Sequence, residues 1–170
     1  YGTYGSFAFG VARPDMGSIT PATTWTMDTW GEYLVACSDA DGKLYEWQLG
    51  FSTPTIAAAI TNAPTSCAAV MTTAERFVFA LGASGNPRLV KWCDQENNTV
   101  WTASTTNQAG DFELQTVGSL KCGKRVRGLN LLFTDVDVHA SSYIGAPYVY
   151  SFEKVGSGCG VISSQAVAAI

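Results

Sequence analysis

Arg88-Leu89-Val90-Lys91-Trp92-Cys93-Asp94-Gln95-Glu96-Asn97, closed by Trp101, reads as a strand that ends in a tryptophan, a polar turn and a second tryptophan. A weaker version is Lys43–Trp47, and a third is Pro147–Phe152. Trp47 and Trp92 are 45 residues apart, and Trp92 and Phe152 are 60 apart. A repeat of about 40–50 residues built from short strands is typical of propeller blades. We therefore expect Trp47, Trp92 and Phe152 to occupy equivalent core positions in successive sheets, with one loop inserted in the longer interval.

The composition favours an all-β fold. Charged residues make up only 14% of the 170-residue chain, whereas about 25% is usual. Seventeen glycines accompany five tryptophans, seven tyrosines and eight phenylalanines, which favours sheets and tight turns. No amphipathic helix of useful length is evident. We expect β-propeller-like blades of antiparallel meanders, an incomplete set that belongs to a longer chain.

The charge pattern argues against recognition of nucleic-acid sequence. The net charge is −4, and the nearest approach to a basic patch is a single expected strand with Lys121, Lys124, Arg125 and Arg127. A solvated strand face is the simpler interpretation of these four side chains. No apolar run reaches the roughly 18 residues that a membrane-spanning helix needs, so no membrane partner is expected.

The expected strands fall into three groups. The first group is Thr23–Asp28, Glu32–Cys37 and Lys43–Leu49, with Asp41-Gly42 at a hairpin tip and 55–60 as a connection between blades. The second is Cys67–Thr73, Phe77–Leu81, Leu89–Trp92 and Val100–Ala103. The third includes Arg125–Arg127, Leu129–Thr134 and Tyr148–Phe152.

Both ends of the chain are expected to contact other polypeptide. Residues 1–22 look like an irregular glycine-aromatic arm, and residues 23–170 hold about three blades, with a last strand from Val161 that is unfinished. An incomplete sheet exposes unpaired backbone groups and apolar faces, which invite pairing. The expected assembly contacts are Tyr1, Tyr4, Phe7, Phe9, Val161 and Ile170.

No catalytic, cofactor or metal site is expected. His139 is the only histidine and has no nucleophile motif near it. Asp135, Asp137 and His139 would share one face of an extended strand, which is a possible metal site or, more simply, a solvated polar edge. Asp39 and Asp41 begin like a calcium loop, but Gln48 stands where the closing Glu is needed, so a hairpin tip is the better interpretation.

The five cysteines, at 37, 67, 93, 122 and 159, form no CxxC pair and cannot pair evenly. We expect them to be reduced thiols, mostly buried as small hydrophobes.

Several of these segments resemble a family of tail structural proteins of short-tailed phages, the nozzle or hub proteins also described as DNA-stabilisation proteins. The similar segments are Thr24–Ala36, Val90–Asn97 with Trp101 and Asn107–Gly110, Phe133–Asp135, Gly145–Tyr150 and the opening Tyr1–Gly5. They follow the family's order over most of the chain, although Cys93 stands where serine is expected. The resemblance implies a virion protein assembled in the host cytoplasm. It also implies a ring of copies beside other tail proteins, with a passage for DNA.

Three functions remain open on the residues alone. The first is a non-enzymatic structural component of a phage tail. The second is a glycan-binding propeller, for which exposure of Trp25, Trp30 and Trp101 would be the discriminating feature. The third is a propeller hydrolase, which requires two carboxylates facing each other in a cleft, about 5–9.5 Å apart.

Overall fold

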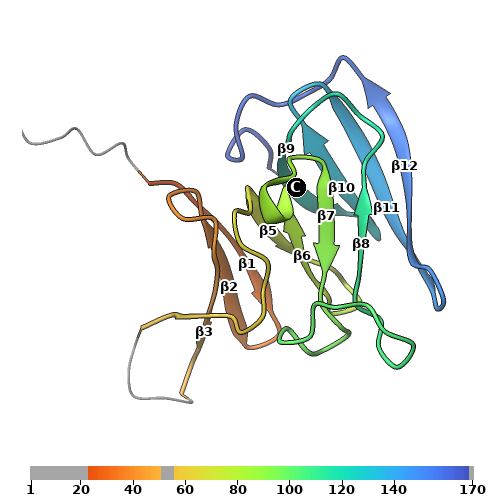
Figure 1. Ribbon diagram of the computed structural model, residues 1–170. Helices are drawn as coiled ribbons and strands as arrows, with labels where there is room; N and C mark the ends of the chain where they lie inside the picture. Colours follow the sequence, from red (N-terminus) through yellow and green to blue (C-terminus); the bar gives the residue numbers. More distant parts are fainter. Residues whose placement is uncertain (1–22, 51–55, 169–170) are drawn as a thin grey trace, which may run out of the picture.

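The chain folds into three four-stranded antiparallel sheets that follow one another in sequence (Figure 1). The computed structural model describes residues 23–50 and 56–168. Each sheet is a meander in which neighbouring strands are joined in chain order, and the only helix in the described part is one short 3₁₀ turn. The predicted all-β class with blade-like meanders is therefore confirmed.

The first sheet has the order β1 (Trp25–Trp30), β2 (Tyr33–Ser38), β3 (Leu44–Gln48) and β4 (Ala58–Ala59). The Asp41-Gly42 hairpin joins β2 to β3; Gly42 has φ +62° and lies against the backbone of Ser66, which leaves no room for a side chain. The segment expected to be only a connection supplies the fourth strand, because Ala59 pairs with Tyr45.

The second sheet contains β5 (Ala69–Thr72), β6 (Val78–Leu81), β7 (Leu89–Trp92) and β8 (Gly110–Glu113), with the 3₁₀ turn η1 (Ala83–Gly85) between β6 and β7. The expected fourth strand at Val100–Ala103 was wrong, since these residues form no strand. Trp101 instead buries its ring and donates its Nε1–H to the carbonyl oxygen of Asn98. The fourth strand forms only after that loop, where Gly110 pairs with Trp92.

The third sheet contains β9 (Leu120–Val126), β10 (Leu129–Thr134), β11 (Asp137–Gly145) and β12 (Val149–Ser157). The sequence analysis missed β11, whose mixture of Ser, Asp and His hides a strand that pairs on both sides. The expected last strand from Val161 is also wrong within the described residues, because 158–168 contain only turns and irregular backbone.

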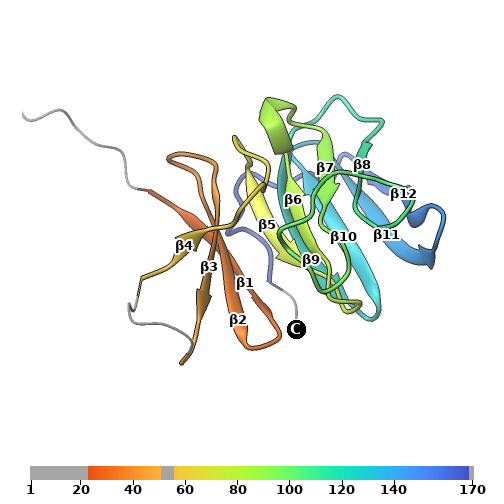
Figure 2. The same cartoon turned by 60° about the horizontal axis from the view of Figure 1, so that its bottom comes forward.

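The sheets stack side by side with the second in the middle (Figure 2). Alternate residues of β6 face opposite ways: Val78 and Ala80 enter one core cluster, and Phe79 and Leu81 enter another. This period of two is what a strand buried on both faces requires. The middle sheet thus has two covered faces, and each terminal sheet has one.

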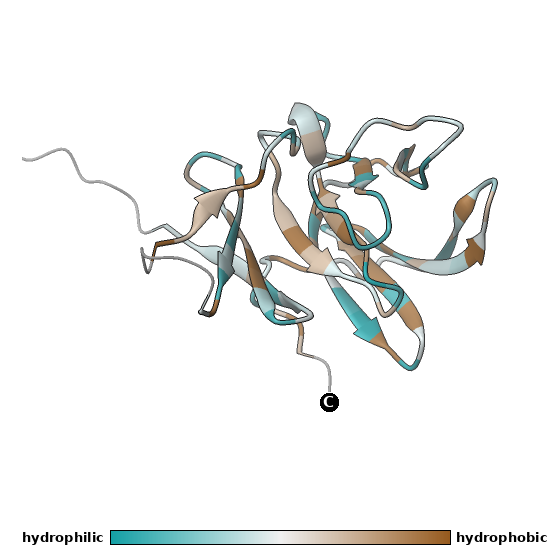
Figure 3. Ribbon diagram, turned by 90° about the horizontal axis from the view of Figure 1, so that it is seen from below, coloured by the Kyte–Doolittle hydropathy of each residue, from teal (hydrophilic) through white to brown (hydrophobic). Residues whose placement is uncertain are grey.

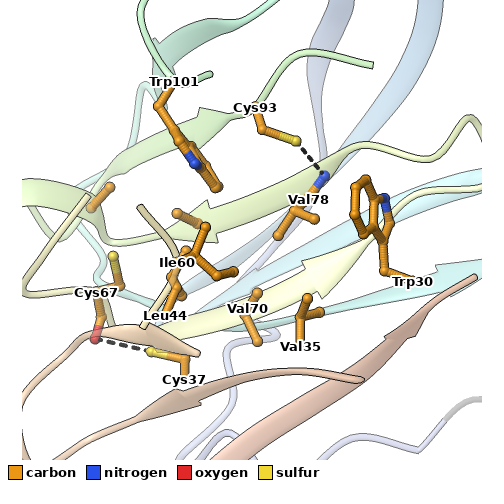
Figure 4. Close-up of a cluster of buried hydrophobic side chains, with 12 residues drawn as sticks. Trp30, Val35, Cys37, Leu44, Ile60, Cys67, Val70, Val78, Cys93 and Trp101 are labelled. Carbon is orange, nitrogen blue, oxygen red and sulfur yellow. Dashed lines mark hydrogen bonds between the residues drawn. The ribbon is translucent and has the colours of Figure 1, made fainter. Parts of the chain in front are cut away.

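We call the cluster between the first and second sheets the first interface (Figure 4). Its buried members are Trp30, Val35, Cys37, Leu44, Ile60, Cys67, Val70, Val78, Ala80, Ala83, Cys93 and Trp101. The cluster between the second and third sheets is the second interface. Its buried members are Ala69, Met71, Phe77, Phe79, Leu81, Val90, Trp92, Leu114, Leu120, Leu132, Val149 and Tyr150.

Candidate functional site

The inner strands of the three sheets, β1, β5 and β9, come together at one edge of the stack. β1 and β5 are tied by polar contacts, because the amide of Val70 donates to Thr26 Oγ1 at 3.0 Å and the amide of Thr72 donates to Asp28 Oδ2 at 2.8 Å. Arg125 of β9 reaches across, with its guanidinium nitrogen 3.8 Å from Asp28 Oδ1. The first strand of every sheet therefore lies on the inside, as it does in propeller blades.

A cavity of about 320 Å³ lies between these inner strands. It is lined by residues of β1, β5 and β9 and by two residues of the C-terminal segment: Trp25, Thr26, Met27, Asp28, Val70, Cys122, Gly123, Lys124, Arg125, Ser164 and Gln165. Gln165 donates its side-chain amide to the carbonyl oxygen of Trp25 at 3.0 Å, so the end of the described chain returns to the first strand.

The electrostatics of this cavity do not suit hydrolysis. Asp28 is the only carboxylate among its described lining residues, whereas a propeller hydrolase needs a facing pair. Both Asp28 oxygens are already engaged: Oδ1 accepts the amide of Thr29, and Oδ2 accepts the amide and hydroxyl of Thr72. What remains available is Lys124, Arg125 and the face of Trp25, which suits a polar ligand with an apolar side.

Trp25, Trp30 and Trp101, whose exposure was expected to discriminate glycan binding from assembly, differ widely in exposed fraction. Trp30 and Trp101 are only 5% and 3% exposed, and both belong to the first interface. Trp25 is 41% exposed and its ring lies 5.7 Å from that of Tyr45. One tryptophan of the three is therefore available for stacking on a sugar.

The repeat residues are placed differently from the expectation. Trp47 and Trp92 both lie on the third strand of their sheets, but they face opposite ways. Trp92 pairs with Phe79 inside the second interface, whereas Trp47 pairs with Leu34 on the face of the first sheet turned away from the middle sheet. The cross-strand pairing is not shifted, because Leu34 and Phe79 are also 45 residues apart; the whole β2–β3 pair instead turns its opposite face to the middle sheet.

The residue that matches Trp92 in the first sheet is Glu46. Val35 and Phe79 both face the following sheet, and their cross-strand partners are Glu46 and Trp92. Glu46 accordingly accepts a hydrogen bond from the side chain of Asn98 in the middle sheet's loop.

Phe152 also departs from the expected equivalence. It lies on the fourth strand of the third sheet, where its ring is 5.9 Å from Trp92 and stacks on Phe112 at 4.5 Å. Trp92 and Phe152 are therefore contact partners across one interface, and they do not occupy matching positions in two sheets.

Of the expected assembly residues, Tyr1, Tyr4, Phe7, Phe9 and Ile170 lie outside the described part of the chain. Val161 is partly buried, and its amide donates to the carbonyl oxygen of Thr134 at 2.8 Å. Within the described residues Val161 thus fastens the C-terminal segment to its own third sheet.

The terminal sheet faces expose apolar side chains that sequence analysis did not single out, with the exception of Trp25 and Trp47. On the outer face of the first sheet, the cross-strand pairs place Trp25, Met27, Leu34, Tyr45 and Trp47 together. Met27 is 57% exposed. We call this the leading face. Alternation within β1 was the signal that could have found it, since Trp25, Met27 and Thr29 share one side.

On the outer face of the third sheet, the same accounting places Lys124, Val126, Leu129, Leu131 and Phe133 together. Leu129 is 42% exposed, and the others are exposed in part. We call this the trailing face. Figure 3 shows hydrophobic residues on strands of all three sheets, including the first and the third.

His139 and Asp137 meet in the interior, not at a polar edge. Asp137 is fully buried and binds Lys154 Nζ at 2.6 Å, Thr134 Oγ1 at 2.6 Å and Thr116 Oγ1 at 2.8 Å. His139 Nε2 is 3.3 Å from Asp137 Oδ1. Burial raises the pKa of Asp137, but the hydrogen bonds from Lys154, Thr134 and Thr116 outweigh it and hold the pKa below its usual range.

Asp135, which was expected to share a strand face with Asp137 and His139, makes contacts of its own. Its Oδ1 accepts the amide of Ser119, and its Oδ2 lies 3.9 Å from Lys121 Nζ. Across residues 23–50 and 56–168, no group of three or more His, Cys, Asp or Glu side chains is placed to hold a metal ion. The Asp39 and Asp41 carboxylates hold the β2–β3 hairpin through Thr24 and Tyr45.

No protein-family model matches this chain, and no curated protein sequence matches it. Among the described residues, none of the helical segments is long and apolar enough to cross a membrane.

Proposed function

We propose that this chain is a non-enzymatic structural subunit that works by assembly, as a component of a phage tail built from rings of copies. The observation that carries the proposal is the pair of apolar faces at the two ends of the sheet stack. Monomeric proteins rarely leave contiguous apolar patches uncovered, and such patches are typical of contact surfaces. The order of motifs that resembles short-tailed phage tail proteins gives the assembly its setting.

The interior supports this function as well. The carboxylates of the interior are engaged in structural contacts: Asp137 binds hydroxyl and ammonium donors within and beside the third sheet, and Asp28 accepts from Thr72 across the first two sheets. A structural subunit needs such ties, whereas an enzyme needs accessible groups with free positions.

The proposed place in a phage tail is tested by peptide mass analysis of purified particles of a phage whose genome encodes this sequence. Peptides of this chain should appear in stoichiometric amounts and should persist in isolated tails. Their absence from purified particles, with the protein present in the infected-cell lysate, would overturn the proposed virion role.

A second function, glycan binding, is favoured by one feature. Trp25 borders the 320 Å³ cavity together with Asp28, Arg125 and Gln165, and a half-exposed tryptophan beside polar groups is a usual platform for a sugar ring. Titration of the chain with oligosaccharides of increasing length, followed by tryptophan fluorescence, tests it. Saturable quenching that Trp25→Ala abolishes would support glycan binding, and an unchanged spectrum would exclude the sugars used.

A further inference from the structure

The leading and trailing faces are the two halves of one kind of interface. Each internal contact joins the successor-facing side of one sheet to the predecessor-facing side of the next: Val35 meets the side of Val70, and Phe79 meets the side of Leu132. The leading face is the predecessor-facing side of the first sheet. The trailing face is the successor-facing side of the third. Within the described residues neither is covered by another sheet, and only their inner ends, at Trp25, Met27 and Lys124, border the cavity that Ser164 and Gln165 also line.

We propose that the trailing face of one copy stacks on the leading face of a second copy, so that two copies continue the stack head to tail. This proposal rests on the proposed assembly function and names the contact that would perform it. The contact repeats the pairing rule of the two interfaces already present, in which unlike faces meet.

The three sheets of the described residues amount to six in two copies, which lies within the four to eight of closed propellers. A contact between unlike faces closes into a ring when the rotation between copies allows it. Two copies joined in this way bury both leading and both trailing faces.

The chemistry of the two faces is compatible. The strand positions of the leading face carry no charge: Trp25, Met27, Thr29, Leu34, Ala36, Ser38, Tyr45 and Trp47. The trailing face is apolar at Leu129, Leu131 and Phe133, and the cross-strand row of Leu131 and Ala140 carries Lys124 at one end and Glu153 at the other. Against the leading face the Lys124 ammonium would meet aromatic rings, whose faces attract a cation.

The test uses one exposed residue on each face, so that the variants keep their fold. Met27→Glu places a charge on the leading face, and Leu129→Lys places one on the trailing face. Val117→Glu is the matched control, because Val117 is 92% exposed and lies in the loop before β9, away from both faces. Sedimentation velocity over a concentration series gives the mass, and thermal melts followed by circular dichroism establish that each variant is folded.

We expect the unaltered chain and the control to sediment as two chains of 18.0 kDa each. Each single variant should be a monomer at the same concentration, with a dissociation constant raised at least tenfold. An equimolar mixture of the two should recover the dimer. In that mixture one interface is unaltered, and the other places the new glutamate opposite the new lysine. Trp47→Glu and Leu131→Lys provide a second pair if a first variant melts early.

Three results would overturn the proposal. The unaltered chain could remain a monomer; Leu129→Lys could still dimerise, which would mean that leading faces meet each other; or the mixture could fail to recover the dimer. A monomeric chain found in phage tails would overturn this contact alone. A head-to-tail dimer absent from particles would instead overturn the virion role and leave the contact standing.

Discussion

The two internal interfaces are built from different side chains. The first interface holds three cysteines, several small aliphatic residues and two tryptophans at its margins, and it is flanked by the polar ties of Asp28 and Thr26 (Figure 4). The second interface is aromatic: Tyr150 lies 4.8 Å from Phe79 and 5.6 Å from Trp92, both edge to face. The first interface therefore combines aliphatic packing with flanking hydrogen bonds, whereas the second is dominated by ring packing and adds a buried hydrogen bond between Thr73 Oγ1 and the Tyr150 hydroxyl at 2.8 Å.

This difference indicates how each interface should fail. Ring packing is lost in proportion to the atoms removed and is insensitive to charge. Buried hydrogen bonds are lost when one partner is removed, because the other is left without compensation. Single substitutions can therefore separate the two kinds of contact.

Removal of a ring from the second interface should have the largest effect. Phe79 is fully buried between Trp92 and Tyr150, so Phe79→Ala should lower the free energy of unfolding by about 3–5 kcal/mol. Phe112→Ala is the control, because Phe112 is 39% exposed although it stacks on Phe152. Urea unfolding measures both. Equal losses for the two variants would contradict the placement of the core at Phe79.

The first interface should respond to loss of a hydroxyl. Thr72 is 1% exposed, and its Oγ1 donates to Asp28 Oδ2 at 2.9 Å. Thr72→Val keeps the shape and removes this donor, which should cost about 1–3 kcal/mol because a buried hydrogen bond to a carboxylate is lost. Thr29→Val, at an exposed position of the neighbouring strand, should change the free energy of unfolding by less than about 0.5 kcal/mol. A neutral Thr72→Val would show that Asp28 is satisfied without this hydroxyl.

Acid should weaken the third sheet through Asp137. Its pKa is lowered in the folded chain, so ionised Asp137 contributes stability that is fully present above the unfolded pKa of about 3.9. That contribution is lost as the pH falls through the lower, folded pKa. The free energy of unfolding should decrease below about pH 5, and Asp137→Asn should be less stable at pH 7 but show a flatter dependence below pH 5. Parallel pH profiles for the two proteins would contradict this role.

The sequence was sufficient for the class and for most strands, because alternation and an Asp-Gly turn are local signals. It was insufficient for β11, where buried Asp137, His139 and Ser141 imitate a polar loop. The burial of Asp137 depends on partners brought from Thr116 and Lys154, which no local pattern reveals. The equivalence of Trp47 with Trp92 failed for a related reason: spacing places both on a third strand with the same pairing, but which face of the strand pair meets the neighbouring sheet is decided by tertiary packing.

The trailing face, unlike the leading face, could not have been found from the sequence pattern. Leu129, Leu131 and Phe133 read as an ordinary buried strand until Leu132 is seen to take the covered side. An apolar run of this kind does not say which face is covered. The cavity beside Trp25 likewise requires β1, β5 and β9 to meet, which only the stacking of the sheets produces.

Chemical modification of the thiols should have the smallest effect on stability. It should also report most directly on the packing of the first interface. Burial raises the pKa of Cys37 to about 12, of Cys67 to about 11 and of Cys93 to about 12, and these thiols carry little thiolate at neutral pH. Cys93 also accepts the amide of Val78 at 3.2 Å, and Cys37 donates to the carbonyl oxygen of Cys67.

Because thiolate is the reactive form, a colorimetric thiol reagent should modify only the exposed Cys159 quickly in the folded chain. In denaturant all five thiols should react, since the structure leaves all five free. Rapid modification of more than one thiol in the folded chain would mean that the first interface opens more readily than its packing implies. A denatured chain with a single reactive thiol would instead require two disulfides, which this arrangement of the cysteines does not contain.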